Sequence, residues 1–517
     1  MSILPVGETS DDTPPATLMQ EGTPVERPLL RRTQGTTTLL NEARGADDPA
    51  PASPEQERAI ADLVKVRETN TSVMVYTFNT GQWTRDSVDV RADLQKLFSN
   101  TRSADVLVVG LQEVPTGEAG SMEEPIKRAL DGRYTHCFTD STSQSWRGWK
   151  ANLAKFGLST LVFSRNGFPG EVRSAGKRRR LKNTLTKQSL VSFLAINGPG
   201  VGRCDLRVVN THAPFKGPLD TIVHFAKLHS VLIESNGVYA NTILLGDFNS
   251  RFNKMTFNKN VSGTSASQQA AFDKYLCDSF ALMNLYTKWY EEGAEGTFKE
   301  YLLQHGDAPC EEGAPRGMFG GPRRSSPYNR ALDQLIEADE FGVLMKSAPT
   351  RVNQYIHHVK QIDNFPLVKT VLQALTHGAH LLSSMQEGAI DFPPTYKVEP
   401  NAGQPAVITG LKDDKKRRMP GYADRVAWIT PGDVRVRCDL YNAFPINLHS
   451  DHLPVFALLK LRRERGDDRT VASSDTAPAS VASDRVLEPF SVSVSGEKMG
   501  AAVLVAAVLS MLVFAMR

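Results

Sequence analysis

Two neighbouring segments of the chain combine cationic side chains with a carboxylate. FPPTYK ends in Lys397, and the following KRRMPGYADRVAW contains Lys416, Arg418 and Asp424. Lysine and arginine hold phosphate oxygens through charge-assisted hydrogen bonds, and a carboxylate just before a strand can orient a histidine that comes from elsewhere. The two segments therefore indicate a site for a phosphorylated substrate and predict a hydrolase.

Further polar residues fall where apolar, strand-like runs begin or end. In chain order they are Asn79, Gln112, Glu113, His212, Asp247, Asn249, Asp424, Ser450, Asp451 and His452. For any one position the ordinary explanation is equally good, because Asn, Asp and Gly commonly terminate strands. Taken together, these residues favour one shared site at one edge of the sheets.

Three of these residues offer oxygen donors for a metal ion. Glu113, Asp451 and Asn79 come without a cysteine among them, which favours a hard cation such as Mg²⁺ over Zn²⁺. Such a cation neutralises charge on phosphoryl oxygens and stabilises the departing alkoxide. The sequence therefore predicts a Mg²⁺ cofactor.

The other polar residues suit the activation of water. Asp247, with Asn249 two residues later, can orient and deprotonate the attacking water. Asp424 and His452 can form a pair in which the carboxylate sets the imidazole tautomer and keeps a positive ring against the phosphate. His212 remains to bind a phosphate oxygen or to assist the leaving group.

The elements that must position these residues follow from the hydrophobic pattern. Short apolar runs alternate with helical stretches, which predicts a layered α/β protein. Several runs are continuously apolar, as in strands that are covered on both faces. The predicted strands are VMVYTFN, DVLVVGLQE, LSTLVFS, SLVSFLAI, LRVVNTH, TILLGDFN, RVAWIT and PVFALLK. Helical spacing predicts a helix over 218–235, and the stretches 265–292 and 351–373 are also expected to be helical.

The motifs TFN, LQE, NTH, GDFN and SDH, in this order, resemble the motif series of the endonuclease/exonuclease/phosphatase superfamily. FPPTYK and KRRMPGYADR resemble the signature of the inositol polyphosphate 5-phosphatases, and the likeness spans residues 72–461. It implies a DNase I-like four-layer sandwich, with two packed mixed β-sheets flanked by helices, and it implies a helix over 331–341, after the G-D-x-N motif. It further implies that Glu113 is the main metal ligand, that Asp247 and Asn249 handle the water, and that Asp424 supports His452.

The same resemblance implies which residues bind the substrate. Tyr396, Lys397, Lys416 and Arg418 would contact the phosphate next to the one removed. The expected substrate-binding set is completed by Lys187, the only residue of LTKQSL that keeps the family's N-K-G motif, and by Arg425.

The chain departs from the 5-phosphatase pattern at four further positions. Ser250 stands where an aromatic residue is usual, Tyr422 and Ala423 replace Trp and Cys, and Leu453 replaces a common basic residue. We expect these departures to affect head-group preference rather than the chemistry.

The favoured function is that of a phosphoric monoester hydrolase of the 5-phosphatase type. It would use Mg²⁺ to hydrolyse the 5-phosphate of phosphoinositides, such as phosphatidylinositol 4,5-bisphosphate, or of inositol polyphosphates at a membrane surface. One alternative is a phosphodiesterase of the same superfamily, a nuclease or sphingomyelinase, although FPPTYK then has no evident use. The other is a catalytically silent module that binds phosphoinositides.

Composition limits the partners and the compartment. A chain of 517 residues, 40% hydrophobic, can form one large or two modest domains. Its net charge of +3 is too small to favour nucleic acid by bulk electrostatics. Five scattered cysteines without a C-x-x-C pair favour reduced thiols in a cytosolic setting. The expected partners are phosphoinositides or inositol polyphosphates and an anionic membrane surface, with no nucleic acid, and a monomer is expected.

The pattern divides the chain into four parts. Residues 1–55 are expected to be a disordered tail, and residues 56–462 a catalytic domain with insertions at about 252–374. Residues 463–498 resemble a flexible linker. Residues 499–516 are uncharged and long enough, at about 27 Å as a helix, for a thin bilayer.

The apolar segment 499–516 is therefore predicted to be a C-terminal tail anchor. A buried soluble helix and a GPI signal are the alternatives, but no secretory signal peptide is visible. The expected location is a membrane, the endoplasmic reticulum or another endomembrane, with the catalytic domain in the cytosol. A dense basic run from Arg173 to Lys182 is either a solvated or nuclear-import-like loop or a contact with anionic lipid.

Overall fold

The computed structural model describes thirteen stretches of the chain. They are residues 70–81, 88–98, 104–115, 122–142, 156–182, 187–214, 218–250, 266–294, 296–305, 327–359, 366–398, 420–445 and 450–464. The predicted tail and anchor lie outside these ranges, as do Lys416, Arg418 and all of the predicted linker except its first two residues, the first of which, Arg463, ends a strand. Within them, no helix has both the length and the apolar character needed to cross a bilayer.

Two mixed sheets form the centre of the protein. The first sheet has the order β12-β13-β1-β2-β4-β3, and in it only β1 and β2 run parallel. Its strands are β1 (Thr71–Asn79), β2 (Val106–Pro115), β3 (Tyr134–Ser141), β4 (Phe156–Arg165), β12 (Val434–Ala443) and β13 (Val455–Arg463).

The second sheet has the order β10-β11-β9-β8-β7-β5, and β6 also pairs with β7. Here β8 and β9 are the parallel pair. The strands are β5 (Glu171–Ser174), β6 (Arg179–Lys182), β7 (Gln188–Gly198), β8 (Gly202–His212), β9 (Thr242–Asp247), β10 (Gln386–Glu387) and β11 (Asp424–Ile429).

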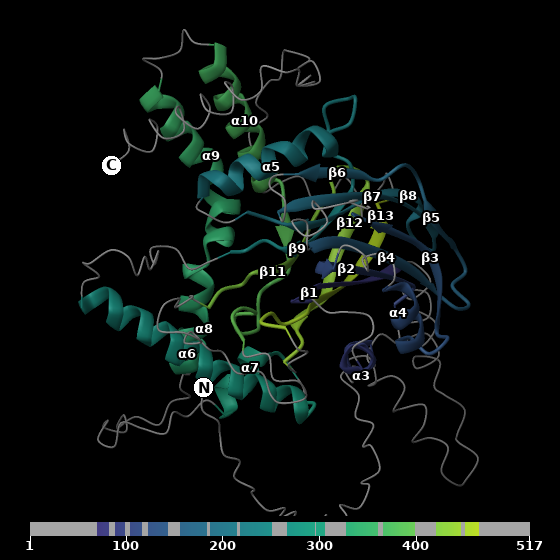
Figure 1. Cartoon of the computed structure of the whole chain (residues 1–517), viewed down its shortest axis with the longest axis horizontal. Helices are drawn as coiled ribbons and strands as arrows, with labels where there is room; N and C mark the ends of the chain where they lie inside the picture. The colour runs from purple at the N-terminus through teal and green to yellow at the C-terminus, as the bar shows by residue number, and fades with distance from the viewer. Residues whose placement is uncertain are drawn as a thin grey trace, which may run out of the picture.

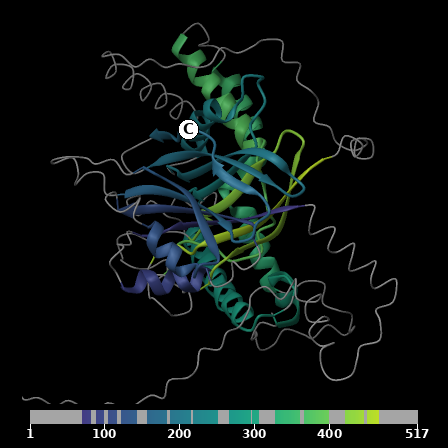
Figure 2. The same ribbon diagram turned by 90° about the vertical axis from the view of Figure 1, so that its right-hand side faces the viewer.

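Helices cover the outer faces of both sheets (Figures 1 and 2). The helices are α3 (Val88–Phe98), α4 (Glu123–Ala129), α5 (Pro218–Leu232), α6 (Ala266–Glu291), α7 (Phe298–His305), α8 (Pro327–Ala338), α9 (Glu340–Val359) and α10 (Pro366–Ser383). In both views α9 and α10 lie at the top of the molecule, and α6 and α7 lie at the bottom.

The layers are held by two apolar clusters. Phe225 of α5, Leu344 of α9 and Leu375 of α10 are buried together with strand residues of the second sheet such as Leu244. The larger cluster joins the inner faces of both sheets to α3, α4 and α6–α8. The predicted four-layer arrangement, with two mixed sheets flanked by helices, is therefore confirmed.

The strands that the sequence predicted are the interior strands of the two sheets. All eight apolar runs form strands, namely β1, β2, β4, β7, β8, β9, β11 and β13. The unpredicted strands β3, β5, β6, β10 and β12 all lie at the sheet edges. An edge strand has one solvated side, so it carries polar residues, as the alternating burial of β12 shows.

The helix predictions hold for α5, α6 and α8, within a few residues at each end. The single helix predicted over 351–373 is wrong, because this stretch includes the end of α9 and the start of α10, with residues 360–365 outside the description. Pro349 is accommodated inside α9. α3, α4 and α7 were not predicted.

One glycine brings β8 and β9 together beside the polar edge. Gly246 has φ +147°, and a Cβ at this position would lie 2.0 Å from the carbonyl oxygen of Thr211. Real Cβ atoms do not approach backbone oxygens so closely, so β9 can reach Asp247 in this register only with glycine at position 246.

We expect Gly246→Ala to lower the free energy of unfolding by about 3 kcal/mol or more, because strain and overpacking combine. Gly237→Ala is the matched control: its φ is +80°, but a Cβ there meets no described atom within 4 Å. It should cost roughly 1 kcal/mol through backbone strain alone. Urea unfolding measures the two losses, and soluble yield replaces it if a variant does not fold. Equal losses in the two variants would contradict this explanation.

A buried histidine ties α5 to the second sheet. Nε2 of His224 lies 2.9 Å from Oγ1 of Thr211 and 3.3 Å from Oγ of Ser189. Burial, aided by the positive charges of Lys227 and His212, lowers the pKa of His224 to about 3. The imidazole is therefore neutral in the folded protein at neutral pH.

His224 should make the fold sensitive to acid. The unfolded chain protonates this residue near pH 6.5 but the folded protein only near pH 3, so its stabilising contribution is complete above pH 6.5 and falls as the pH drops toward 3. Acidification from pH 7 to 5 should cost roughly 2 kcal/mol through this group.

Urea unfolding at the two pH values measures this cost. His224→Gln keeps a side-chain amide near Thr211 and should reduce the acid sensitivity, whereas His305→Gln, on an exposed residue of α7, should not. An unchanged pH dependence in His224→Gln would show that the acid sensitivity arises elsewhere.

Candidate active site

Strand register places three of the predicted site residues side by side. In the second sheet His212 pairs with Asp247, and Asp247 pairs with Asp424. These residues end β8, end β9 and begin β11, so all three lie at one edge of the sheet. They are almost completely buried, at 2%, 1% and 0% exposure.

The first sheet contributes Asn79 and Glu113 to the same edge. Asn79 ends β1 opposite Gln112 of the parallel strand β2. A register shift between Leu111 and Val114 then interrupts the ladder, and Glu113 within it has φ +56°. A bulge of this kind turns a side chain out of the ladder, and here the carboxylate of Glu113 comes within 3.6 Å of Nε2 of His212.

Asp247 is the centre of the cluster because donors from both sheets converge on its carboxylate. Oδ2 accepts hydrogen bonds from Nδ2 of Asn79 at 3.0 Å and Nδ2 of Asn249 at 3.1 Å, and it lies 3.2 Å from Nε2 of His212. Oδ1 accepts one from the backbone N–H of Asn249 at 2.7 Å. Asn249 adopts φ +53°, a left-handed conformation that asparagine tolerates better than most residues.

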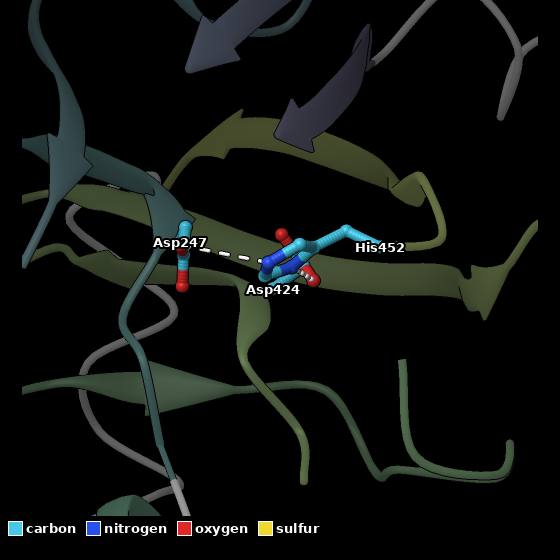
Figure 3. Close-up of side chains that lie close together, drawn as sticks. All are labelled: Asp247, Asp424 and His452. Carbon is cyan, nitrogen blue, oxygen red and sulfur yellow. Dashed lines mark hydrogen bonds and ion pairs between the residues drawn. The ribbon is translucent and has the colours of Figure 1, made fainter. Parts of the chain in front are cut away.

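His452 lies between two carboxylates (Figure 3). Its Nδ1 is 2.8 Å from Oδ2 of Asp424, and its Nε2 is 3.9 Å from Oδ2 of Asp247. The first distance is a hydrogen bond and the second is too long for one. The predicted pairing of Asp424 with His452 is therefore present, with Nε2 directed toward Asp247.

The buried charges of this cluster shift one another. Burial opposes the positive charge of His452, but Asp424, Asp247 and Asp451 outweigh it and raise the pKa to about 10. Burial would raise the pKa of Asp247, yet His452, His212 and Lys187 hold it below its usual range. Burial raises the pKa of Asp424 to about 6, against the effect of His452. The arrangement favours an imidazolium facing an ionised Asp247.

Side chains of both negative and positive charge lie next to His212. Its Nε2 faces Asp247 and Glu113, as described, and is also in contact with Nζ of Lys187. Lys187 precedes β7, and Gln188 beside it pairs with His212 across the sheet. The structure thus brings Lys187 next to the cluster, on the side of β8 away from His452.

The donor chemistry around the cluster fits a hard divalent cation. The Glu113 side chain is 25% exposed and that of Asp451 is 31% exposed. Oδ1 of Asn79 accepts a hydrogen bond from the backbone N–H of Gly81 and remains a carbonyl-type oxygen. Oxygen donors of this kind, without a thiolate, suit Mg²⁺ or Ca²⁺ rather than Zn²⁺.

A second donor group consists of Asp247, Asp424 and His452, whose ligand atoms all lie within 4.8 Å of one another. It is the poorer place for a cation, because the raised pKa of His452 keeps a proton on the imidazole. His452 would have to lose both that proton and its hydrogen bond to Asp424 in order to coordinate a metal.

The predicted substrate-binding residues Tyr396 and Lys397 lie beside His452. The Tyr396 ring is 2% exposed and packs on the imidazole, with centroids 4.6 Å apart. Nζ of Lys397 is 2.9 Å from Oδ2 of Asp451. Burial would raise the pKa of Asp451, but His452 and Lys397 lower it. Lys397 is accessible enough to meet a substrate, whereas the visible contact of Tyr396 supports the imidazole.

Arg425 does not lie where the sequence analysis expected it. It is 1% exposed, and its guanidinium is held by Glu387 and Asp339 in the protein interior. The family resemblance implied a substrate contact for Arg425, but successive residues of a strand point to opposite faces. Arg425 therefore points away from the face on which Asp424 meets His452.

The structure adds two hydroxyl residues that the sequence analysis left without a role. Oγ1 of Thr395 donates to Oδ2 of Asp424 at 3.0 Å. Oγ of Ser450 donates to the carbonyl oxygen of Asn79 at 2.6 Å and accepts a hydrogen bond from the His452 backbone N–H. Both stand inside quoted motifs, FPPTYK and SDH, so the motifs themselves were the available signal.

A buried amide pair joins the two sheets directly behind the site. Nε2 of Gln112 donates to Oδ1 of Asn210 at 2.8 Å, and Nδ2 of Asn210 donates to two carbonyl oxygens of the first sheet. Each amide lies one or two residues before a site residue, Glu113 and His212. The middle residue of LQE and the first residue of NTH thus align the sheets.

The chain is similar to known proteins in sequence. The family model described as Endonuclease/Exonuclease/phosphatase family 2 matches residues 346–458. Type I inositol polyphosphate 5-phosphatase 2 of Arabidopsis thaliana is 32% identical over 137 residues, which are 26% of this chain and 20% of that protein. Phosphatidylinositol 3,4,5-trisphosphate 5-phosphatase 1 of Xenopus laevis is 24% identical over 150 residues, 28% of this chain and 15% of that protein.

The matches span at most a fifth of the length of these two relatives. Among solved structures, the 5-phosphatase domain of SPsynaptojanin in complex with inositol (1,4)-bisphosphate and calcium ion matches at 16% identity and a TM-score of 0.40. The match covers 81% of this chain and 94% of that one. The fold assignment rests on the strand order and register rather than on this superposition. On the family model, the related sequences and the ordered motifs, the chain is similar to the endonuclease/exonuclease/phosphatase family and, within it, to the inositol polyphosphate 5-phosphatases.

Proposed function

We propose that this protein is a Mg²⁺-dependent phosphatase that removes the 5-phosphate from phosphoinositides or inositol polyphosphates. The observation that carries the proposal is the convergence on Asp247 of two amide side chains and His212, with the His452 imidazolium on its other side. The FPPTYK segment adds Lys397 next to this cluster. The similarity of the chain to the named 5-phosphatases supports the choice of substrate class.

In this proposal Asp247 orients the water that attacks phosphorus. Its lowered pKa makes it a weak base in the ground state, so it accepts the water proton only as the oxygen–phosphorus bond forms. The hydrogen bonds from Asn79 and Asn249 hold the carboxylate in one orientation, which lowers the entropic cost of aligning the water.

The two histidines stabilise charge on the phosphoryl group. His452 presents a proton on Nε2, while Asp424 holds Nδ1 and so sets the direction of the ring. His212 and Lys187 supply further polar side chains on the opposite side of Asp247. Preorganised donors of this kind stabilise the transition state more than the ground state.

A divalent cation would be held by Glu113, with Asn79 and Asp451 completing the oxygen donors. When bound, such a cation supplies charge neutralisation at the phosphoryl oxygens and at the leaving oxygen. Lys397, which is paired with Asp451 at 2.9 Å, would then be available to a neighbouring phosphate of the substrate. Lys416 and Arg418, outside the described residues, are proposed to contact the same phosphate.

Asp247→Asn should decrease kcat for inositol 1,4,5-trisphosphate by roughly 10³-fold, because the side chain keeps its shape but loses the charge that orients and accepts the proton. Phosphate release measured with and without Mg²⁺ tests this. Asp220→Asn, an exposed residue of α5, is the matched control and should retain full activity.

A substrate panel separates the alternatives. Loss of activity when the 5-phosphate is absent from the substrate supports the proposed specificity. Cleavage of DNA or sphingomyelin, without release from inositol phosphates, would instead favour a phosphodiesterase. Tight binding of phosphoinositides without release at any Mg²⁺ concentration would favour a silent binding module.

We further propose that the lipid substrate is met at an anionic membrane surface. The basic segment 171–182, whose strands β5 and β6 both pair with β7, carries Arg173, Lys177, Arg178 and Arg179, all exposed. Lys182, at the end of β6, shares a row with Gln188, His212 and Asp247. At about 4.8 Å per strand, β6 lies roughly 14 Å from Asp247 along that row. A surface that binds the basic segment therefore lies close to the site.

Residues 499–516 are proposed to anchor the chain in an endomembrane, with the phosphatase domain in the cytosol. This proposal rests on the apolar composition of that segment and the polar linker before it. Vesicle binding should therefore have two components, one from the basic segment 171–182 and one from residues 499–516, and the two can be measured separately.

Lys177→Ala/Arg179→Ala, in a chain that lacks residues 499–517, should weaken binding to phosphatidylserine vesicles about 30-fold at low salt, since each charge contributes about 1 kcal/mol. Arg178 is left in place because it pairs loosely with Asp140 at 3.9 Å. Lys288→Ala/Arg330→Ala, exposed residues of α6 and α8, is the control. Equal binding of both double variants excludes the contact through the basic segment, and release of the full-length chain from membranes by carbonate excludes the anchor.

A further inference from the structure

The junction between α8 and α9 places a fully buried carboxylate behind the candidate active site. Asp339 is 1% exposed and lies between the last residue of α8 and the first of α9. Its Oδ1 accepts a hydrogen bond from Oγ of Ser250 at 2.6 Å. Its Oδ2 accepts hydrogen bonds from the Gly342 backbone N–H at 2.7 Å and from Nη1 of Arg425 at 2.5 Å. Both carboxylate oxygens are therefore engaged.

The side-chain partners of Asp339 are the residues that directly follow two site residues. Ser250 follows Asn249, which donates two hydrogen bonds to Asp247. Arg425 follows Asp424, which holds the His452 imidazole. One carboxylate of the helical region thus contacts both the loop after β9 and the start of β11, although these segments lie far apart in the sequence.

The side-chain polar atoms of Ser250 and Arg425 are all engaged in hydrogen bonds. Ser250 donates to Asp339 and accepts a hydrogen bond from the Phe341 backbone N–H at 3.1 Å. Arg425 donates from Nε and Nη2 to both carboxylate oxygens of Glu387, at 2.8 and 2.6 Å, and its guanidinium lies 5.0 Å from the centre of the Phe341 ring. Buried groups with every polar atom engaged have one preferred arrangement, because any other leaves a charge or a donor unsatisfied.

The loop that Ser250 holds has a conformation that needs support. Asn249 has φ +53°, and its Nδ2 also donates to the carbonyl oxygen of Ala213. A left-handed residue is kept in place only when the chain on both sides is restrained. Asp247 restrains the entry side and Ser250 the exit side. Ser250 is also one of the positions at which this chain departs from the 5-phosphatase pattern.

We propose that Asp339 is a positioning residue that sets Asn249 and Asp424 in register at the same time. The helical region at about 252–374 would then be a structural part of the active site rather than an appendage to it. This inference deepens the proposed function and rests on it for its kinetic readout, but its structural readout is independent of turnover. The rival explanation is that Asp339 only balances the charge of Arg425 in the core.

Ser250→Ala tests the inference with the least damage to the core, because it leaves the pairing of Asp339 with Arg425 intact. We expect kcat for inositol 1,4,5-trisphosphate with Mg²⁺ to fall between 10- and 100-fold, since small misplacements of a positioned group carry costs of this size. KM should change less than about threefold, because Ser250 is buried and touches no substrate. Ser279→Ala, another fully buried serine, on α6, should leave both constants unchanged.

Hydrogen exchange gives the readout that does not depend on catalysis. The peptide that contains residues 247–250 should exchange at least 10-fold faster in Ser250→Ala, whereas the peptide that covers α5 should not change. Asp339→Asn should accelerate exchange in both 247–250 and 424–426 if it folds. Ser250→Thr retains a hydroxyl and should restore most of kcat and of the protection.

The positioning role and the proposed function would be overturned by different results. Unchanged exchange at 247–250 in Ser250→Ala, or a kcat that falls only in proportion to the folded fraction, would overturn the positioning role. A parent protein that releases no phosphate removes the proposed function, yet the exchange rates of the same variants still decide whether Asp339 couples the two segments.

Discussion

A buried carboxylate is stable only where opposite charge or hydrogen-bond donors surround it, and Asp247 meets that condition by drawing on both sheets. Asn79 comes from β1, His212 from β8 and Asn249 from the loop after β9. Separation of the sheets would leave this charge unsatisfied in the interior. The need to satisfy Asp247 therefore requires that the two polar strand edges meet, and the site lies at their junction.

The polar contacts behind the site also join separate layers of the protein. Gln112 and Asn210 share a hydrogen bond across the sheets, and Thr211 is tied to α5 through His224. These groups lie one or two positions before residues of the site along their strands. Since side chains alternate along a strand, Asn210 shares the face of His212 and meets the first sheet, whereas Thr211 between them faces α5.

The region between β9 and β11 is long, and most of its helices cover apolar surface. α9 and α10 pack with α5 on the second sheet, while Tyr286 of α6 donates a hydrogen bond to the carbonyl oxygen of Ala443 at the end of β12. Among its described helices, it is the α8–α9 junction that contacts residues beside the polar edge, through Asp339. An insertion of this kind can stabilise the sheets broadly and still influence the chemistry at a single point.

The sequence by itself determined the interior strands, the order of the motifs and the residue types that meet at one edge, because a strand covered on both faces is mostly apolar and the polar site residues fall at its ends. It could not reveal the edge strands, since one-sided solvation makes β3 and β12 resemble loops. Only the tertiary structure decided that Arg425 turns inward to Asp339 and Glu387, and that Tyr396 packs against His452. A motif gives the position of a residue along the chain, but the direction of its side chain and its partners depend on segments that come together only in the folded protein.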